Sequence, residues 1–222
     1  KDGIPNIVGV PKTIDNDLPI TDSSPGYGSA AKYVAISTLE ASYDVASLAS
    51  TSTKVFVLEV MGRHAGWIAL AGGLASKPDN PIPVILLLPE IPFDQEKYLA
   101  KVKAMVEQFG YCSVVAAEGV QNKDGQFLVV TGKKDIFGHS QLGGVAPVVS
   151  SLVKEAFAYK CHWAVADDMQ RSAGHIASKT DMEQAYAVGK AAVEFALEGK
   201  NAIMLTIVRL SNSPYRWKIG YA

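Results

Sequence analysis

The polar loop 11–19, which has a proline at each end, holds the residues best suited to chemistry. Proline prevents helix continuation, so the loop should be extended or turned, and residues two apart then tend to point the same way. Asp15 and Asp17 would therefore enter one space, with Lys12 and Thr13 within reach. A carboxylate can accept the proton of an attacking hydroxyl while a cation neutralises a transferred group, as phosphoryl transfer requires. The same residues also fit an acidic turn.

Two further stretches place polar groups directly after apolar runs. Met61, Gly62 and Arg63 follow the run 54–60 and precede a stretch rich in Ala and Gly. Gly62 would let a ligand approach the backbone, and Arg63 supplies a planar fork suited to oxygen anions. Glu118 follows the run 112–117 in the same way. The alternative interpretation is that Met61 packs in the core, that Arg63 lies on the surface and that Glu118 faces solvent. The neighbouring histidine at 64 has no evident partner, and we interpret it as structural.

Short apolar runs alternate with longer helical patterns along the chain. The predicted strands cover 4–10, 54–60, 82–88, 112–117, 161–165 and 202–208, and the predicted helices cover 28–50, 64–76, 94–109, 145–159 and 181–198. Most strands are apolar throughout, as strands buried on both faces are, so an α/β fold with mostly parallel sheets flanked by helices is expected. Doubly wound sheets bind their ligands at the carboxyl ends of the strands, where the polar residues above fall.

Two local signals refine this scheme. Thr180 and Glu183 match a capping box, and residues at helical spacing follow them: Met182, Ala185, Tyr186, Gly189, Val193, Ala196 and Leu197. The glycine pair 143–144 is interpreted as a turn before the helix 145–159, because no P-loop lysine accompanies it.

The composition excludes several classes of protein. With 48% hydrophobic and 19% charged residues the chain can form a core, and a net charge of −1 without a basic run gives no support for nucleic-acid binding. No apolar stretch reaches the roughly 18 residues of a transmembrane helix, and no signal peptide is evident. Cys112 and Cys161 lack CxxC partners and should be free thiols. We expect a cytoplasmic protein, and the absence of an initial Met predicts that the chain belongs to something longer.

The sequence Pro-Lys-Thr-Ile-Asp-Asn-Asp at 11–17 resembles the catalytic loop of the phosphofructokinase family almost residue for residue. The resemblance implies that Asp15 is the general base on the 1-hydroxyl of fructose 6-phosphate, that Thr13 contacts the sugar phosphate and that Asp17 helps to place the substrate. It gives Lys12 a catalytic role beside Asp15. Pyrophosphate-using members have Lys at this position and bacterial ATP-using members generally have Gly. Some ATP-using members also have Lys, so both donors stay open.

The later motifs resemble the same family. Met61, Gly62 and Arg63 are similar to its fructose 6-phosphate-binding segment, and Glu118 resembles the glutamate that accepts sugar hydroxyls. Lys54 lies where a subunit-bridging, substrate-binding cation is expected.

The segment 167–172 resembles the family's late motif that ends in Gln-Arg, which implies that Arg171 binds the 6-phosphate. The family usually has His or Tyr three residues earlier, where this chain has Asp168. A carboxylate beside a phosphate dianion is unfavourable, so Asp168 is left out of the expected site.

The resemblance also implies a domain organisation with two Rossmann-like domains, the first incomplete. Residues 1–28 would end the phosphate-donor domain, 29–169 would bind the sugar phosphate, and 170–222 would return to the first domain. The family's upstream Gly-Gly-Asp motif, whose Asp holds Mg²⁺, has no counterpart before residue 4. We therefore expect no metal ligands within this chain and little or no activity from the 222 residues alone.

The expected full-length protein is a homo-oligomer that transfers phosphate from pyrophosphate, or alternatively from ATP, to fructose 6-phosphate. A hypothesis of another class is a non-catalytic regulatory or sugar-phosphate-binding subunit. The intact Asp15 and Asp17 argue against it, since a sensor needs no general base.

Overall fold

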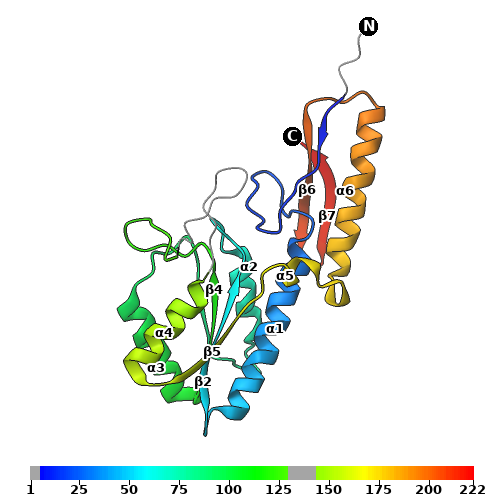
Figure 1. Cartoon of the computed structure of the whole chain (residues 1–222). Coiled ribbons are helices and arrows are strands. Elements are labelled where there is room, and N and C mark those ends of the chain that lie inside the picture. The colour runs from blue at the N-terminus through cyan, green and yellow to red at the C-terminus, as the bar shows by residue number, and fades with distance from the viewer. Residues whose placement is uncertain (1–5, 130–143) are drawn as a thin grey trace.

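Two separate sheets organise the chain (Figure 1). The computed structural model describes residues 6–129 and 144–222. The larger sheet has the order β3-β4-β2-β5, with β3 at Val84–Leu87, β4 at Cys112–Ala117, β2 at Thr53–Val60 and β5 at Lys160–Val165. All three of its pairings are parallel. The expectation of an α/β fold with a parallel sheet is confirmed.

The smaller sheet has the order β1-β6-β7, with β1 at Val8–Gly9, β6 at Ile203–Asn212 and β7 at Tyr215–Tyr221. Strand β1 pairs in parallel with β6, whereas β6 and β7 form an antiparallel hairpin. Residues almost two hundred positions apart in the sequence therefore lie side by side in this sheet.

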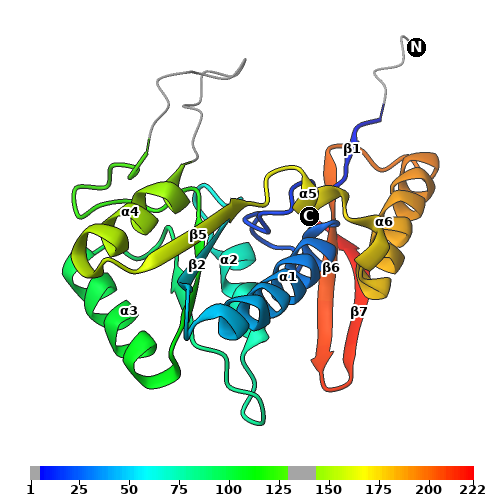
Figure 2. The same ribbon diagram turned by 60° about the horizontal axis from the view of Figure 1, so that its bottom comes forward.

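Helices cover both faces of the larger sheet (Figure 2). Helix α1 (Tyr27–Leu48) and the short helix α2 (Trp67–Ala71), which continues as the 3-10 helix η1 (Gly72–Ala75), pack on one face. Helices α3 (Gln95–Phe109) and α4 (Val145–Phe157) pack on the other. After β5 come α5 (Met169–Ser172) and the 3-10 helix η2 (Gly174–Ile176), and α6 (Lys179–Leu197) then packs on the smaller sheet. None of the helices formed by residues 6–129 and 144–222 has the length and apolar content needed to cross a bilayer.

The core follows from the apolar strands. Every residue of β4 is buried, and Val55 and Val57 of β2 are fully buried beside it. A second, smaller core joins α6 to the smaller sheet through Val188 and Leu205. Both thiols are free, Cys112 buried and Cys161 half-buried. Burial raises the pKa of Cys112 to about 12, so this thiol stays protonated at neutral pH.

Several predicted elements differ from the observed ones. The strand predicted at 82–88 is only Val84–Leu87, because Pro83 and Pro89 flank it and lack the N–H that a ladder needs. Only Val8–Gly9 of the strand predicted at 4–10 forms, and residues 4 and 5 lie outside the described residues. The helix predicted at 64–76 begins only at Trp67, after the glycine-containing turn.

Strand β7 was not among the predicted strands, because its residues alternate between apolar and charged instead of being apolar throughout. Trp217 and Ile219 pack towards α6, while Arg216 and Lys218 are exposed. This alternation is the ordinary pattern of a strand with one solvated face.

The capping box predicted for α6 is wrong. The helix begins earlier, with Ser178 as its N-cap, and the hydroxyl of Ser178 accepts a hydrogen bond from the backbone N–H of Asp181 at 3.4 Å. The buried face also differs from the predicted apolar one, since Met182, Tyr186, Val193 and Leu197 are exposed. Of the turn predicted at 143–144, Gly144 is the N-cap of α4 with φ 93°, and residue 143 lies outside the described residues.

The buried carboxylate of Asp181 joins the N-termini of α6 and α1. It accepts hydrogen bonds from the backbone N–H groups of Gly26 at 2.7 Å and Ser29 at 3.2 Å, and from the Ser29 hydroxyl. The Ser29 hydroxyl in turn accepts from the backbone N–H of Ser178. A side chain at Gly28 would meet Asp181, because an added Cβ would lie 3.1 Å from the Asp181 Cβ. The start of α1 is therefore fixed against α6.

We predict that Asp181→Asn lowers the free energy of unfolding by about 1–3 kcal/mol, because it removes a negative charge bound by free N–H groups at a helix N-terminus. Urea denaturation measures this change. Glu183→Gln is the matched control, since Glu183 is exposed on the same helix and pairs with Lys179 only at 3.8 Å. Equal effects of the two substitutions would contradict the prediction.

Candidate active site

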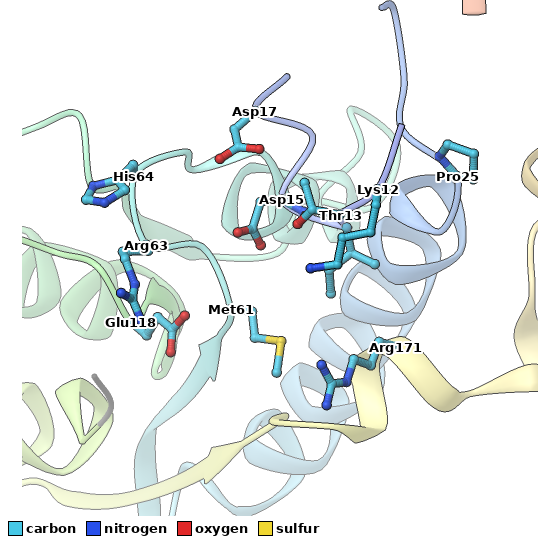
Figure 3. Close-up of a pocket in the computed structure, with 11 residues that line it drawn as sticks. Lys12, Thr13, Asp15, Asp17, Pro25, Met61, Arg63, His64, Glu118 and Arg171 are labelled. Carbon is cyan, nitrogen blue, oxygen red and sulfur yellow. The ribbon is translucent and has the colours of Figure 1, made fainter. Parts of the chain in front are cut away.

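One cavity of about 550 Å³ collects most of the residues that the sequence singled out (Figure 3). Its lining combines cations, carboxylates and a few apolar side chains: Lys12, Thr13, Ile14, Asp15, Asp17, Pro25, Met61, Arg63, His64, Glu118 and Arg171. Eight of the ten predicted site residues are in this set. Gly62 belongs to the same turn, between Met61 and Arg63, and Lys54 lies elsewhere.

Three of the contributing segments follow neighbouring strands of the larger sheet. The register pairs Val60 of β2 with Ala117 of β4, and Glu59 of β2 with Val165 of β5. The three strands therefore end level with one another, and the residues after them meet at one edge of the sheet. This is why Met61, Glu118 and Arg171 share a cavity.

The fourth segment is the loop 11–25, which leaves β1 of the other sheet and is anchored at several points. The backbone N–H of Asp22 donates to the carbonyl of Ile207, and the Thr21 hydroxyl accepts from the N–H of Ile207. The Asp22 carboxylate binds Arg209 at 2.8 Å and Tyr215 at 2.9 Å. The loop is therefore tied to β6 and β7 before it reaches α1.

Inside the loop the backbone is strained. Thr13 has φ 140° and Asn16 has φ 57°, values that side-chain-bearing residues rarely adopt. The Asn16 amide oxygen accepts from the backbone N–H of Ser24, and the Thr13 hydroxyl accepts from that of Asp15. These bonds hold the turn that carries Asp15 and Asp17 into the cavity.

Glycines permit the turns after β2 and β4 to touch. Gly62 has φ 131°, and a Cβ there would lie 2.6 Å from the carbonyl oxygen of Ala65. A Cβ on Gly119 would lie 1.9 Å from the carbonyl oxygen of Arg63. Gly62 thus permits the tight turn that carries Arg63, and Gly119 lets the Glu118 turn pack backbone to backbone against that turn, with its N–H donating to the Gly62 carbonyl at 3.2 Å.

The cavity places like charges close together in a partly desolvated space. The pKa of Asp15 is raised, chiefly by burial and then by the neighbouring charge of Asp17, while Lys12 and Arg63 oppose the shift. The pKa of Glu118 is also raised, again chiefly by burial. A carboxylate whose pKa lies above its ordinary value is a stronger base, so Asp15 is suited to accept a proton.

Arg171 is ion-paired with Asp168. Asp168 therefore lies beside the cation that the family resemblance assigns to the 6-phosphate, although Asp168 was left out of the expected site. Both side chains are more than half exposed, at 56% and 70%, so the pair is a weak, solvent-screened one that an anionic ligand can displace.

Comparison with known proteins identifies the family. A family model described as Phosphofructokinase matches residues 2–196. The chain belongs to the phosphofructokinase family. Among relatives, the pyrophosphate–fructose 6-phosphate 1-phosphotransferase of Methylococcus capsulatus is 61% identical over 215 residues, which are 97% of this chain and 51% of that protein.

The crystal structure of a pyrophosphate-dependent phosphofructokinase from Nitrosospira multiformis has a TM-score of 0.88 and 62% identity, covering 98% of this chain and 51% of that one. The relative named ATP-dependent 6-phosphofructokinase 1 of Nostoc sp. is more distant, at 35% identity over 91% of this chain and 53% of that protein. The chain thus spans about half the length of the relatives it matches.

Lys54 does not reach the phosphofructokinase cavity of its own chain. It lies at the amino end of β2, opposite Met61, and its Nζ donates to the carbonyl of Ala49 at 2.7 Å. Its expected role as a subunit-bridging cation stays a prediction.

Sequence reasoning gave no role to two buried polar residues beside the site, Glu59 and Gln170, which are each 1% exposed. The Glu59 carboxylate, just before the Met61 turn, accepts from the backbone N–H groups of Gly144 and Ala146 and so binds the N-terminus of α4. A charged residue inside an apolar strand is the signal that could have indicated it. His64 lies at the edge of the cavity, with its ring 6.0 Å from that of Phe127.

Among the described residues, no group of three or more His, Cys, Asp or Glu side chains could hold a metal ion.

We predict that Asp15→Asn raises the free energy of unfolding at neutral pH. A raised pKa means that the ionised carboxylate is less stable in the folded chain than in the unfolded one. The stabilisation should therefore shrink as the pH falls through the pKa of Asp15, because wild-type Asp15 is then protonated. Urea denaturation across the acid range measures the difference, with Asp44→Asn on the exposed side of α1 as the control. The absence of any gain at neutral pH would argue against a destabilised carboxylate.

Proposed function

We propose that the protein transfers a phosphoryl group from pyrophosphate to the 1-hydroxyl of fructose 6-phosphate, giving fructose 1,6-bisphosphate and orthophosphate. The observation that carries the proposal is the convergence of a base with a raised pKa, Asp15, and three cations, Lys12, Arg63 and Arg171, on one cavity. The names of the relatives with 61% and 62% identity support the choice of reaction and donor.

In this proposal the Asp15 carboxylate accepts the proton of the 1-hydroxyl as its oxygen bonds to the transferred phosphorus. The bond between that phosphorus and the bridging oxygen of pyrophosphate breaks, and orthophosphate leaves. Lys12 and Arg63 neutralise the charge on the transferred group, which is the main requirement of phosphoryl transfer. Burial of Asp15 excludes part of the water that would otherwise weaken these interactions.

The other lining residues hold the sugar. Arg171 would bind the 6-phosphate, Glu118 would accept a sugar hydroxyl, and Met61 would pack against the sugar with Gly62 leaving room beside the backbone. Thr13 and Asp17, on the same loop as Asp15, would place the substrate. The order of these groups around the cavity, with Arg171 on α5 and Asp15 on the loop from β1, would set the two ends of the sugar phosphate apart.

Magnesium is proposed as the partner of pyrophosphate, since Mg²⁺ is usually bound through substrate phosphates and few protein groups. We also propose that the full-length protein forms a homo-oligomer and that the 222 residues alone are inactive. The domain division is proposed to fall at 1–28, 29–169 and 170–222. An ATP donor is the nearest alternative, because a relative named ATP-dependent is 35% identical.

The first test is a donor comparison on the full-length protein, with fructose 6-phosphate and Mg²⁺. We expect turnover with pyrophosphate and little or none with ATP. Turnover with ATP alone would keep the reaction and discard Lys12 as a donor marker.

Two variants in the same assay keep its outcome interpretable. Asp15→Asn should lower kcat by about 10²–10⁴-fold, the usual contribution of a general base, while Asp44→Asn should not change it. Binding of fructose 6-phosphate without turnover by any donor would favour the regulatory-subunit hypothesis instead.

We also predict that Asp168→Asn tightens fructose 6-phosphate binding about two- to fivefold, because the phosphate no longer competes with an exposed ion pair worth roughly 0–1 kcal/mol. Titration calorimetry without a phosphoryl donor measures it. Asp167→Asn is the control, since Asp167 makes no ion pair among the described residues. Weaker binding in Asp168→Asn would mean that the carboxylate helps the substrate.

A further inference from the structure

The side chain of Gln170 is the buried polar link between two parts of the cavity. Gln170 is only 1% exposed, although it belongs to α5, a short helix whose other residues are exposed. Its Oε1 accepts from the backbone N–H of Met61 at 3.2 Å, and its Nε2 donates to the backbone carbonyl of Asp167 at 2.9 Å. Both polar ends of the amide are therefore used.

These two bonds continue the β2–β5 pairing beyond the end of the sheet. The last backbone bond of that pairing joins the N–H of Ala166 to the carbonyl of Glu59 at 2.9 Å. Past this point β5 turns away through Asp167, which has the left-handed φ of 40°. The Gln170 amide then spans from the turn after β5 to Met61, the first residue after β2.

Gln170 directly precedes Arg171 in the sequence. Met61 and Arg171 both line the cavity, and they come from the ends of different strands. Among the described residues, the Gln170 amide links the segment 61–66 to the segment 167–172, and no backbone hydrogen bond joins these two segments. Any shift of α5 relative to the Met61 turn would therefore stretch this amide link.

We propose that Gln170 is a positioning residue, which fixes Arg171 at a set distance from the Met61 turn so that both contact fructose 6-phosphate together. The inference rests on the proposed function, from which it takes the substrate. It requires one acceptor facing the Met61 N–H and one donor facing the Asp167 carbonyl, and an amide is the side-chain group that supplies both.

The chemistry of the amide dictates the test variants. Gln170→Glu keeps an acceptor for Met61 but, when ionised, has no donor for the Asp167 carbonyl. Gln170→Met has a similar length and replaces neither bond, and it leaves two backbone groups without their partner. Gln170→Asn keeps the amide donor and acceptor but shortens the side chain by one methylene. It is the variant to measure if the other two do not fold.

The experiment measures steady-state kinetics and fructose 6-phosphate binding in the full-length protein, together with the unfolding midpoint. We expect KM and the dissociation constant for fructose 6-phosphate to rise by roughly tenfold or more, with a smaller change in KM for pyrophosphate, because misplaced binding groups lose affinity at the sugar. Ser172→Ala is the matched control on α5, since its hydroxyl makes only a local bond to the Asp168 carbonyl.

A merely structural role would lower the unfolding midpoint and the amount of active protein, and leave both constants for fructose 6-phosphate unchanged in the folded fraction. That result overturns the proposal for Gln170 while the wild type still binds and turns over its substrate. If the wild type does not bind fructose 6-phosphate, the proposed function fails and this inference fails with it.

Discussion

The hydrogen bonds of Asp181 at the start of α1 hold together the two halves of the site. One half, the loop 11–25, leaves the smaller sheet, and the other follows strands of the larger sheet. Helix α1 packs on the larger sheet and begins two residues after Pro25, while Asp181 belongs to the helix that packs on the smaller sheet. Because its carboxylate binds the N-terminus of α1, the position of Asp15 relative to Arg63 depends on this contact.

The geometry of the site destabilises the folded chain, so contacts from the surrounding structure must hold the site residues in place. Asp15 is partly buried beside the negative charge of the exposed Asp17, and Thr13 has a strained backbone. Such arrangements persist only where neighbouring segments are fixed, as here by the backbone contact between Gly119 and Arg63 and by the bonds of Asp22 to β6 and β7. A stable parallel sheet with a fully buried β4 supplies the rigid body for this strain.

Much of the larger sheet could be predicted from the sequence, because strands buried on both faces are apolar throughout. The bounds of β4 are those predicted, and β2 and β5 each begin one residue earlier than predicted. The same reasoning missed β7, whose alternating residues have one solvated face, and it chose the wrong face of α6. Helical spacing shows that a helix forms, but the side that is buried depends on the surface it meets, here with Val188 inward and Tyr186 outward.

The sequence by itself determined which chemical groups this chain has and that they follow strand ends: Asp15 after one apolar run, Arg63 and Glu118 after two others. It did so because local preferences and apolar runs act over a few residues. Only the tertiary structure decided which groups meet. It brings Arg171 into the cavity beside Met61 and leaves Lys54 at the far end of β2. It also sets the bond of Gln170 to Met61 and the bond of Asp181 to Gly26. Both bonds join residues more than a hundred positions apart, so their geometry depends on the packing of the whole chain.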